Sequence, residues 1–179
     1  MLATVILRPA TGSDVPAMVE LQKDGFRAAL IPLLPDEFEL PDGAPWRAGL
    51  AETLAGDDVR ALVADADGEA GAEGGLAGLV VYGANRDAEP SPGAGEIRAM
   101  FVHPDHWRRG VGRSLVEVAC VDLERMGYSA VTLWSLRDND RATGFYKGLG
   151  FERDGAAQTR PALGAPEVRY AKSLPYYTF

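Results

Sequence analysis

The first third of the chain divides into stretches with different patterns of apolar and polar residues. The run "TVILRPA" is short and rich in β-branched residues, which is typical of a strand. From Val15 to about Leu30 apolar residues recur near helical spacing, which predicts a helix. The Pro-rich, acidic stretch "IPLLPDEFELPDGAP" predicts an irregular connection. A second, short helix is expected from Trp46 to Leu54.

The middle of the chain is dominated by β-rich runs. "VRALVADADG" and "GLAGLVVYG" are separated by "EAGAEGG", a pattern that predicts a hairpin with a flexible turn. "NRDAEPSPGAG" is rich in turn-forming residues and predicts a loop. The run "EIRAMFV" that follows it predicts the next strand.

Helix and strand patterns then alternate to the end of the chain. "SLVEVACVDLERMG" has apolar residues on one helical face and ends at a glycine, as helices often do. "AVTLWSL" predicts a strand, "DRATGFYKGLG" a short helix, and "EVRYAKSL" a last strand. The expected order is strand, one or two helices, three strands, helix, strand, helix and strand. The sequence has no internal repeat, and we expect one domain spanning residues 1–179.

Composition places the chain among ordinary globular proteins, with 46% hydrophobic and 25% charged residues. No apolar run approaches the roughly 20 residues that span a bilayer, so we expect no membrane association. The first residues, "MLATVILRPATGSD", do not resemble a secretory signal peptide. The one cysteine cannot form an internal disulfide, which favours a reducing, cytoplasmic location.

Charge is divided unevenly along the chain. Residues 1–96 hold 17 acidic and 6 basic residues, a net −11, whereas residues 97–179 hold 9 and 12, a net +3. This division argues against nucleic-acid binding, which needs a broad basic face. It suits a protein that holds an anion with its second part and a cation with its first. The alternative is an acidic surface that serves solubility.

Positive charge and glycine are concentrated in "HPDHWRRGVGRSL", between a predicted strand and a predicted helix. Backbone amides at a helix N-terminus have no intrahelical partner and bind anions. Gly110 and Gly112 allow phosphate oxygens to approach those amides, and Arg108, Arg109 and Arg113 add charge. The stretch therefore predicts a diphosphate site. The alternative is a surface turn with solvated arginines.

Two other glycine motifs do not fit this stretch. A Walker loop needs four residues between its glycines and then Lys-Ser or Lys-Thr, which "GVGRS" lacks. A dinucleotide-binding fingerprint needs a third glycine where this chain has Leu115.

From Glu96 to Phe151 the chain resembles the GNAT superfamily of N-acetyltransferases. "EIRAMFVHPDHWRRGVGRSLVEVA" is similar to that family's strand and Gln/Arg-x-x-Gly-x-Gly/Ala pyrophosphate loop. "DNDRATGFYKGLGF" is similar to its Asn-x(6)-Tyr and Gly-Phe block. The resemblance covers about a third of the chain. It departs from the family at Trp107, where the loop usually begins with Gln or Arg, and we expect Trp107 to pack against the following helix.

The resemblance implies a fold and a cosubstrate. The fold would be α/β, of the α+β type: a mixed, mostly antiparallel sheet of six or seven strands, splayed near its centre and flanked by helices on both faces. The cosubstrate would be acetyl-CoA, and no metal is expected. Its pyrophosphate would lie on the amides of a loop formed by Arg108, Arg109, Gly110, Val111, Gly112 and Arg113. Its pantetheine arm would pair with the backbone of Met100, Phe101 and Val102.

Acetyl transfer to an amine requires a base for the amine proton and an acid for the departing thiolate. Glu96 opens the strand that leads into the loop, and similar enzymes often place a carboxylate there. The alternative for Glu96 is a solvated strand-end residue paired with Arg98. Some relatives use a Glu five residues before the Asn, but that position is Trp134 here. Trp134 would line the acceptor site or belong to the core.

Tyr146 is the candidate general acid, because a phenol with a pKa near 10 stays protonated at neutral pH and can donate to a thiolate. Its alternative role is that of an amphipathic core residue. Asn139, at the family spacing from Tyr146, would bond the pantetheine arm, cap the next helix, or do both. His103 and His106 lack the cysteine neighbours typical of a zinc site, and Cys120 is expected to be a core thiol.

The resemblance places the acceptor near the early helices and their connecting loop, which carries Asp36, Glu37, Glu39 and Asp42. We therefore expect a cationic primary amine on a small molecule, peptide or protein. Dimerisation is common among relatives, so a homodimer is a further expectation. Two alternatives remain: a non-catalytic acyl-CoA-binding module that has lost the chemistry, and a nucleotide-phosphate binder.

Overall fold

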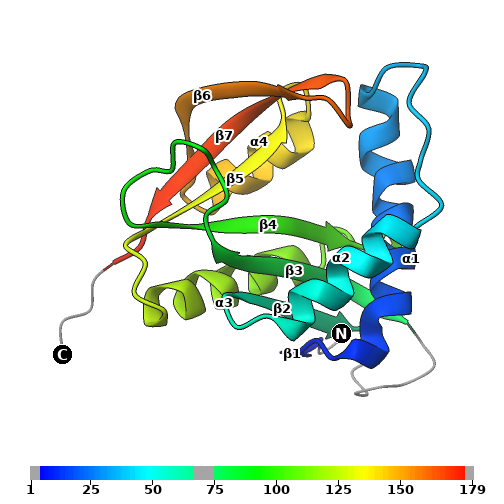
Figure 1. The fold of residues 1–179 in the computed structure, drawn as a ribbon, viewed down its shortest axis with the longest axis horizontal. Helices are drawn as coiled ribbons and strands as arrows, with labels where there is room; N and C mark the ends of the chain where they lie inside the picture. Colours follow the sequence, from blue (N-terminus) through cyan, green and yellow to red (C-terminus); the bar gives the residue numbers. More distant parts are fainter. Residues whose placement is uncertain (1–4, 67–74, 176–179) are drawn as a thin grey trace.

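A computed structural model of the protein describes residues 5–66 and 75–175 (Figure 1). It contains one seven-stranded sheet in the order β1-β2-β3-β4-β5-β7-β6. The strands are β1 (Ile6–Pro9), β2 (Val59–Asp65), β3 (Leu76–Ala84), β4 (Ala94–Val102), β5 (Ala130–Leu136), β6 (Glu152–Arg160) and β7 (Ala165–Ser173). The main helices are α1 (Val15–Gly25), α2 (Ala44–Ala55), α3 (Val111–Arg125) and α4 (Asp140–Gly148).

The pairing confirms the expected mixed, mostly antiparallel sheet. All neighbouring strands are antiparallel except β4 and β5, which are parallel. That parallel pairing covers three positions, from Ala94 opposite Ala130 to Glu96 opposite Thr132. Beyond them the two halves of the sheet separate as a V, and β5 and β7 rise away from β4 (Figure 1). The expected central splay is therefore present.

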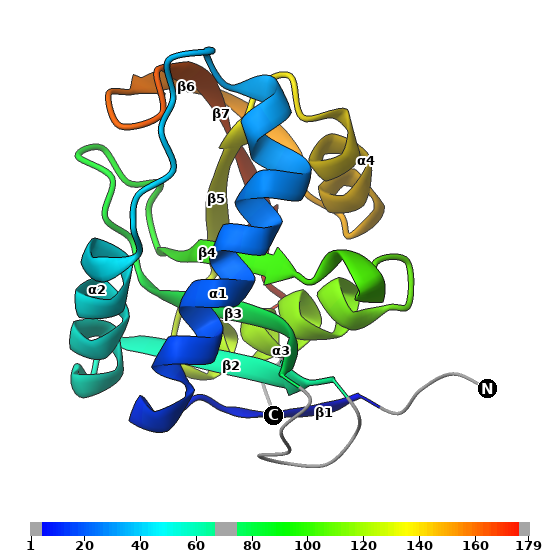
Figure 2. The same cartoon turned by 90° about the vertical axis from the view of Figure 1, so that its right-hand side faces the viewer.

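Helices cover both faces of the sheet, as Figure 2 shows with α2 on one side and α3 and α4 on the other. Alternating residues of β3 divide between two cores, because successive side chains of a strand point to opposite faces. Val80 and Tyr82 pack in the core beneath α3 and α4, whereas Leu79 and Val81 pack beneath α1 and α2. We call the α1–α2 side the front face.

The order of elements agrees with the sequence patterns except at β6. This strand, "ERDGAAQTR", is exposed along almost its whole length and lies at the sheet edge, so it shows no apolar alternation. The other differences lie at element ends. The helix expected from Val15 to Leu30 is α1 followed by a π-helical turn, Phe26–Leu30. Most of the turn "EAGAEGG" lies outside the described residues.

An ionic cluster ties β1 to β2 and to the start of α1. The guanidinium group of Arg8 bonds both carboxylate oxygens of Asp14, at 2.8 and 2.9 Å, and both of Asp65, at 2.9 and 3.0 Å. Both carboxylates are buried. Arg8 lowers the pKa of Asp14 to about 2, outweighing the opposing effect of burial.

The ionised form of Asp14 should therefore stabilise the fold above its unfolded pKa of 3.8, and this contribution should be lost as the pH falls from about 4 to 2. A shift of that size corresponds to roughly 2 kcal/mol. We expect Asp14→Asn to flatten the dependence of the unfolding free energy on pH in this window. Denaturant titrations at several pH values measure it. Asp36→Asn, at an exposed position, should keep the wild-type slope; equal slopes for all three proteins would contradict the assignment.

Candidate active site

A β-bulge lies where β4 leaves β5. Val81 of β3 is opposite Ala99 and Tyr82 is opposite Ile97, so Arg98 is the extra residue. The bulge puts Arg98 and Ala99 on the same face, and Phe101 then packs beside α1 on the front. The bulge immediately follows Glu96, the last residue of β4 that pairs with β5.

Beyond the bulge, no described strand pairs with the β5 side of β4. Backbone groups of alternate strand residues point to opposite neighbours. The amide of His103 donates a hydrogen bond to the carbonyl oxygen of Ala77, near the start of β3. Because Phe101 is two residues from His103, its backbone groups also point toward β3, where it lies opposite Leu79. Met100 and Val102 consequently present their backbone groups to the gap. An extended chain inserted there can pair with β4 as an added strand.

The loop after β4 has the features of an anion site. A short 3-10 turn, Pro104–His106, is followed by two residues in left-handed conformations, Arg108 at φ 62° and Gly110 at φ 85°. α3 starts directly afterwards, at Val111, so its first amides have no intrahelical partner. Arg108, Arg109 and Arg113 are exposed. The strand, loop and helix expected for a diphosphate site are therefore in place.

Trp107 makes two contacts that the sequence did not predict. Its indole Nε1–H donates a hydrogen bond of 2.8 Å to the carbonyl oxygen of Val102. The guanidinium carbon of Arg141, at the start of α4, lies 3.9 Å from the centre of the indole ring. Trp107 thus links the loop to the end of β4 and to α4.

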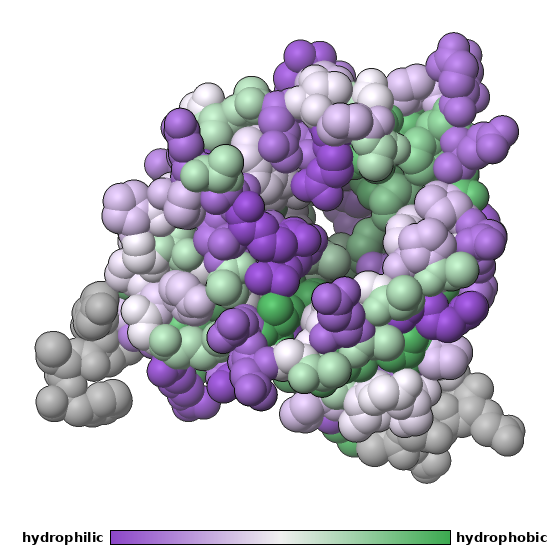
Figure 3. All heavy atoms as spheres, viewed as in Figure 1, coloured by the Kyte–Doolittle hydropathy of each residue, from purple (hydrophilic) through white to green (hydrophobic). Residues whose placement is uncertain are grey.

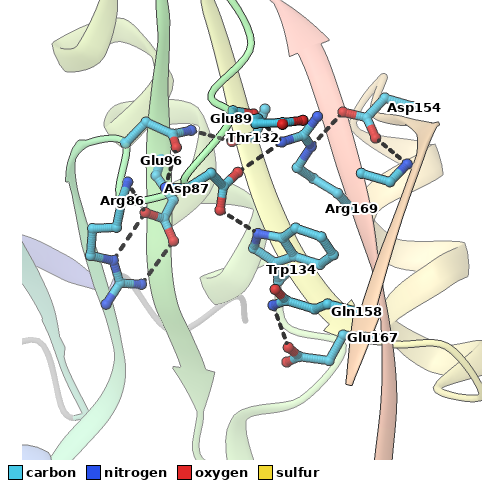
Figure 4. Close-up of polar contacts among 12 residues, drawn as sticks. Arg86, Asp87, Glu89, Glu96, Thr132, Trp134, Asp154, Gln158, Glu167 and Arg169 are labelled. Atoms are coloured by element: carbon cyan, nitrogen blue, oxygen red, sulfur yellow. Dashed lines mark hydrogen bonds and ion pairs between the residues drawn. The ribbon is translucent and has the colours of Figure 1, made fainter. Parts of the chain in front are cut away.

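Glu96 is buried on the front face and paired, but with Arg86 and not with Arg98 (Figure 4). Arg86 donates from Nη2 to one carboxylate oxygen at 2.8 Å, and from Nε and its backbone amide to the other at 3.0 Å each. Arg98 instead donates 2.7 Å to the carbonyl oxygen of Ala84. The alternative of a solvated Glu96 paired with Arg98 is therefore wrong. Burial and the nearby Arg86 lower the pKa of Arg98.

A network of side chains fixes the β3–β4 loop to the far half of the sheet (Figure 4). Asp87 accepts hydrogen bonds from Trp134 Nε1 of β5, at 2.8 Å, and from Arg169 Nη1 of β7, at 2.9 Å. Arg169 also donates 2.6 Å to Asp154 of β6. Asn85 donates 2.8 Å to Thr132. Of these residues the sequence singled out only Trp134, which is half-buried on the front face.

Tyr146 and Asn139 are placed by α4. The Tyr146 side chain is buried among Phe145, Phe151 and Tyr170, and burial raises the pKa of its hydroxyl. Among the described residues this hydroxyl has no hydrogen-bond partner in the structure, so its proton is available to donate. The Asn139 side chain accepts 3.1 Å from the Ala142 amide, which confirms the helix cap. Its amide nitrogen makes no hydrogen bond with a described residue.

The front face is hollowed near its centre (Figure 3). An aromatic cluster at the end of α1 flanks this side of β4, with Phe26 5.7 Å from Phe101, 5.0 Å from Trp46 and 6.2 Å from Phe38 between ring centres. The four acidic residues of the α1–α2 connection are all exposed.

His103 and Cys120, two of the remaining residues considered in the sequence, have local structural roles. His103 Nδ1 accepts 3.2 Å from the Asp105 amide. Cys120 is buried, and burial raises the pKa of its thiol to about 11. Within residues 5–66 and 75–175 there is no group of three or more potential metal ligands. Nor does any helix in those ranges have the length and apolar character to cross a membrane.

Comparison with known proteins identifies the family. Residues 16–151 match the acetyltransferase (GNAT) family. An uncharacterized N-acetyltransferase of Methanocaldococcus jannaschii is 42% identical over 57 residues, 32% of this chain and 25% of that protein. The mycothiol acetyltransferase of Kocuria rhizophila is 38% identical over 63 residues, 35% of this chain and 21% of that protein. The matches thus span a quarter or less of these relatives.

Solved structures share the fold over nearly the whole chain. The ribosomal-protein-alanine N-acetyltransferase of Brucella melitensis has a TM-score of 0.71 at 22% identity, covering 94% of this chain and 99% of that one. The PaiA N-acetyltransferase of Thermoplasma acidophilum, solved with coenzyme A, has a TM-score of 0.71 at 15% identity, covering 95% and 99%. The chain belongs to the GNAT acetyltransferase family.

The left-handed residue before α3 provides a test of the loop. Because Gly110 has φ 85°, Gly110→Ala should destabilise the fold by about 1 kcal/mol, although a Cβ there would meet no atom within 4 Å. Gly144→Ala, at an equally open but helical position, should be neutral or stabilise by up to about 1 kcal/mol. Thermal unfolding measures both. A neutral Gly110→Ala would show that the loop does not require the left-handed conformation.

Proposed function

We propose that this domain transfers an acetyl group from acetyl-CoA to a primary amine. The observation that carries the proposal is the free edge of β4 beyond Glu96, which leads directly into the amide-rich turn before α3. An extended pantetheine arm and a diphosphate are the two chemical groups that match this sequence of features. Family membership supports the same cosubstrate.

In this proposal the chain's own groups hold the cosubstrate as follows. The gap-facing backbone groups of Met100 and the amide of Val102, whose carbonyl oxygen already accepts from Trp107, pair with the pantetheine arm. Phe101, between them, contributes its side chain to the front face. The amides from Arg108 to Arg113 hold the diphosphate. The Asn139 side-chain nitrogen donates to the pantetheine arm while its oxygen caps α4.

The reaction forms a C–N bond to the attacking amine and breaks the C–S bond of the thioester. We assign the amine proton to Glu96 and assign Tyr146 as the donor to the departing thiolate. Both oxygens of Glu96 are held by Arg86. The three hydrogen bonds from Arg86 leave about one of the four acceptor positions of the Glu96 carboxylate free to take a proton, and the 50% exposure of the Arg86 side chain leaves it room to move.

The acceptor is proposed to be a cationic amine on a small molecule, peptide or protein. Four exposed carboxylates lie on the α1–α2 connection, Asp36, Glu37, Glu39 and Asp42, and they favour approach of a positive charge. We also propose a reducing, cytoplasmic location, which the free, buried thiol of Cys120 supports. The proposal further includes a single domain over residues 1–179 that assembles as a homodimer.

The Arg86–Glu96 pair is also the observation that favours a second candidate, an acyl-CoA-binding module without catalysis. A panel of cationic, neutral and acidic amines separates the two. We expect thiol release from acetyl-CoA to be fastest with a cationic amine. Coenzyme A binding without turnover of any amine would favour the module, and faster turnover of acidic amines would contradict the proposed acceptor class.

Tyr146→Phe tests the general acid. It removes the donor hydroxyl and keeps the packed ring, so we expect kcat to fall roughly 100-fold with little change in coenzyme A affinity. Steady-state kinetics and calorimetry measure the two effects. Tyr128→Phe, in the same core, is the matched control and should keep wild-type kcat. A Tyr146→Phe enzyme with full kcat would remove Tyr146 from the mechanism.

A further inference from the structure

The stacked pair of Trp107 and Arg141 joins two parts of the fold that meet at the diphosphate loop. The indole is fixed from below by its 2.8 Å hydrogen bond to the carbonyl oxygen of Val102. Arg141 lies over its face, with the guanidinium carbon 3.9 Å from the ring centre. At this distance the cation is attracted by the aromatic face.

α4 brings Arg141 to this place by packing on the start of α3. A Cβ on Gly112 would lie 3.2 Å from the ring of Phe145 and 3.3 Å from Val102, so this helical glycine allows the close approach. Arg141 and Phe145 are four residues apart in α4 and therefore share a helix face. The contact that seats α4 against α3 thus also directs Arg141 toward the loop.

The stacked guanidinium keeps its hydrogen-bonding capacity. Stacking uses the flat face of the group, while its five N–H donors lie in the plane. Arg141 is exposed, and it has no hydrogen bond or ion pair with any residue that the structure describes. Arg113 and Arg137 differ in this respect, since Arg113 pairs with Glu117 at 3.3 Å and Arg137 with Asp138 at 3.1 Å, whereas Arg108 and Arg109 share it, with no hydrogen bond or ion pair to a described residue.

We propose that Arg141 is a cofactor-binding residue whose guanidinium contacts a phosphate of acetyl-CoA, with Trp107 as the platform that orients it. The inference rests on the proposed function. The proposal explains why Trp107 stands where the family's loop usually begins with Gln or Arg. Trp107 donates to the backbone of Val102, and Arg141 of α4 supplies the phosphate donor in its place.

The test compares Arg141→Gln with the wild type on three thioesters. Loss of a charged hydrogen bond to phosphate should weaken binding of acetyl-CoA roughly 10-fold, measured by calorimetry with coenzyme A and by kcat/KM. S-Acetylpantetheine has no phosphate, so its kcat/KM should not change. Dephospho-acetyl-CoA keeps the diphosphate and lacks the 3′-phosphate, so it tells which phosphate is contacted. Arg137→Gln, in the connection just before α4, is the matched control and should behave as wild type.

The platform is tested by a double-mutant cycle. Trp107→Leu should weaken coenzyme A binding as Arg141→Gln does, and the double variant should show no further loss. Arg141→Lys keeps the charge without the flat group and should recover part of the affinity. Additive losses would mean that Trp107 and Arg141 act separately.

The outcomes are distinguishable from those of the proposed function. A wild-type protein that binds no coenzyme A would overturn the proposed function and this inference with it. A wild type that binds, with Arg141→Gln binding equally well or losing equal activity toward acetyl-CoA and S-acetylpantetheine, would overturn the inference alone. A lower melting temperature of Arg141→Gln at unchanged affinity would likewise show that the stack is purely structural.

Discussion

The separation of β4 from β5 is the constraint on which the rest of the site depends. Two parallel strands that remained paired would satisfy each other's backbone groups and leave no edge for a ligand. Here the pairing stops at Glu96 and Thr132, and the bulge at Arg98 follows at once. The backbone of Met100 and Val102 then faces an open V, and the loop at its end carries the first amides of α3.

An open V in a sheet needs contacts that hold its halves at a fixed distance. On the front face, Asp87 supplies such contacts, because its carboxylate accepts hydrogen bonds from Trp134 of β5 and Arg169 of β7. Both strands lie across the gap from β4. The neighbouring residue in the same loop, Arg86, is bonded to Glu96. The β3–β4 loop therefore contacts both the far half of the sheet, through Asp87, and the candidate base Glu96, through Arg86. On the other face, Phe145 against Gly112 and Arg141 against Trp107 hold α4 to the loop before α3.

The parts of this site that the sequence predicts are the local ones. The strand, glycines and helix of the loop are contiguous, so their composition alone indicates an anion site, and the Asn139 cap depends on a residue three positions away. The partner of Glu96 could not be predicted, because the nearby Arg98 is bonded to Ala84 and Arg86 comes from a loop whose path no pattern determines. The contacts of Arg169 with Asp87 and of Trp107 with Arg141 likewise join residues far apart in the chain. β6 was missed because an exposed edge strand has no buried side to produce alternation.

The most direct test of the account is a crystal structure with acetyl-CoA bound. We expect the pantetheine arm in the V, hydrogen-bonded to the backbone of Met100 and to the amide of Val102, with the diphosphate on the amides before and at the start of α3. A cosubstrate bound elsewhere, or β4 and β5 paired along their whole length in the complex, would contradict it.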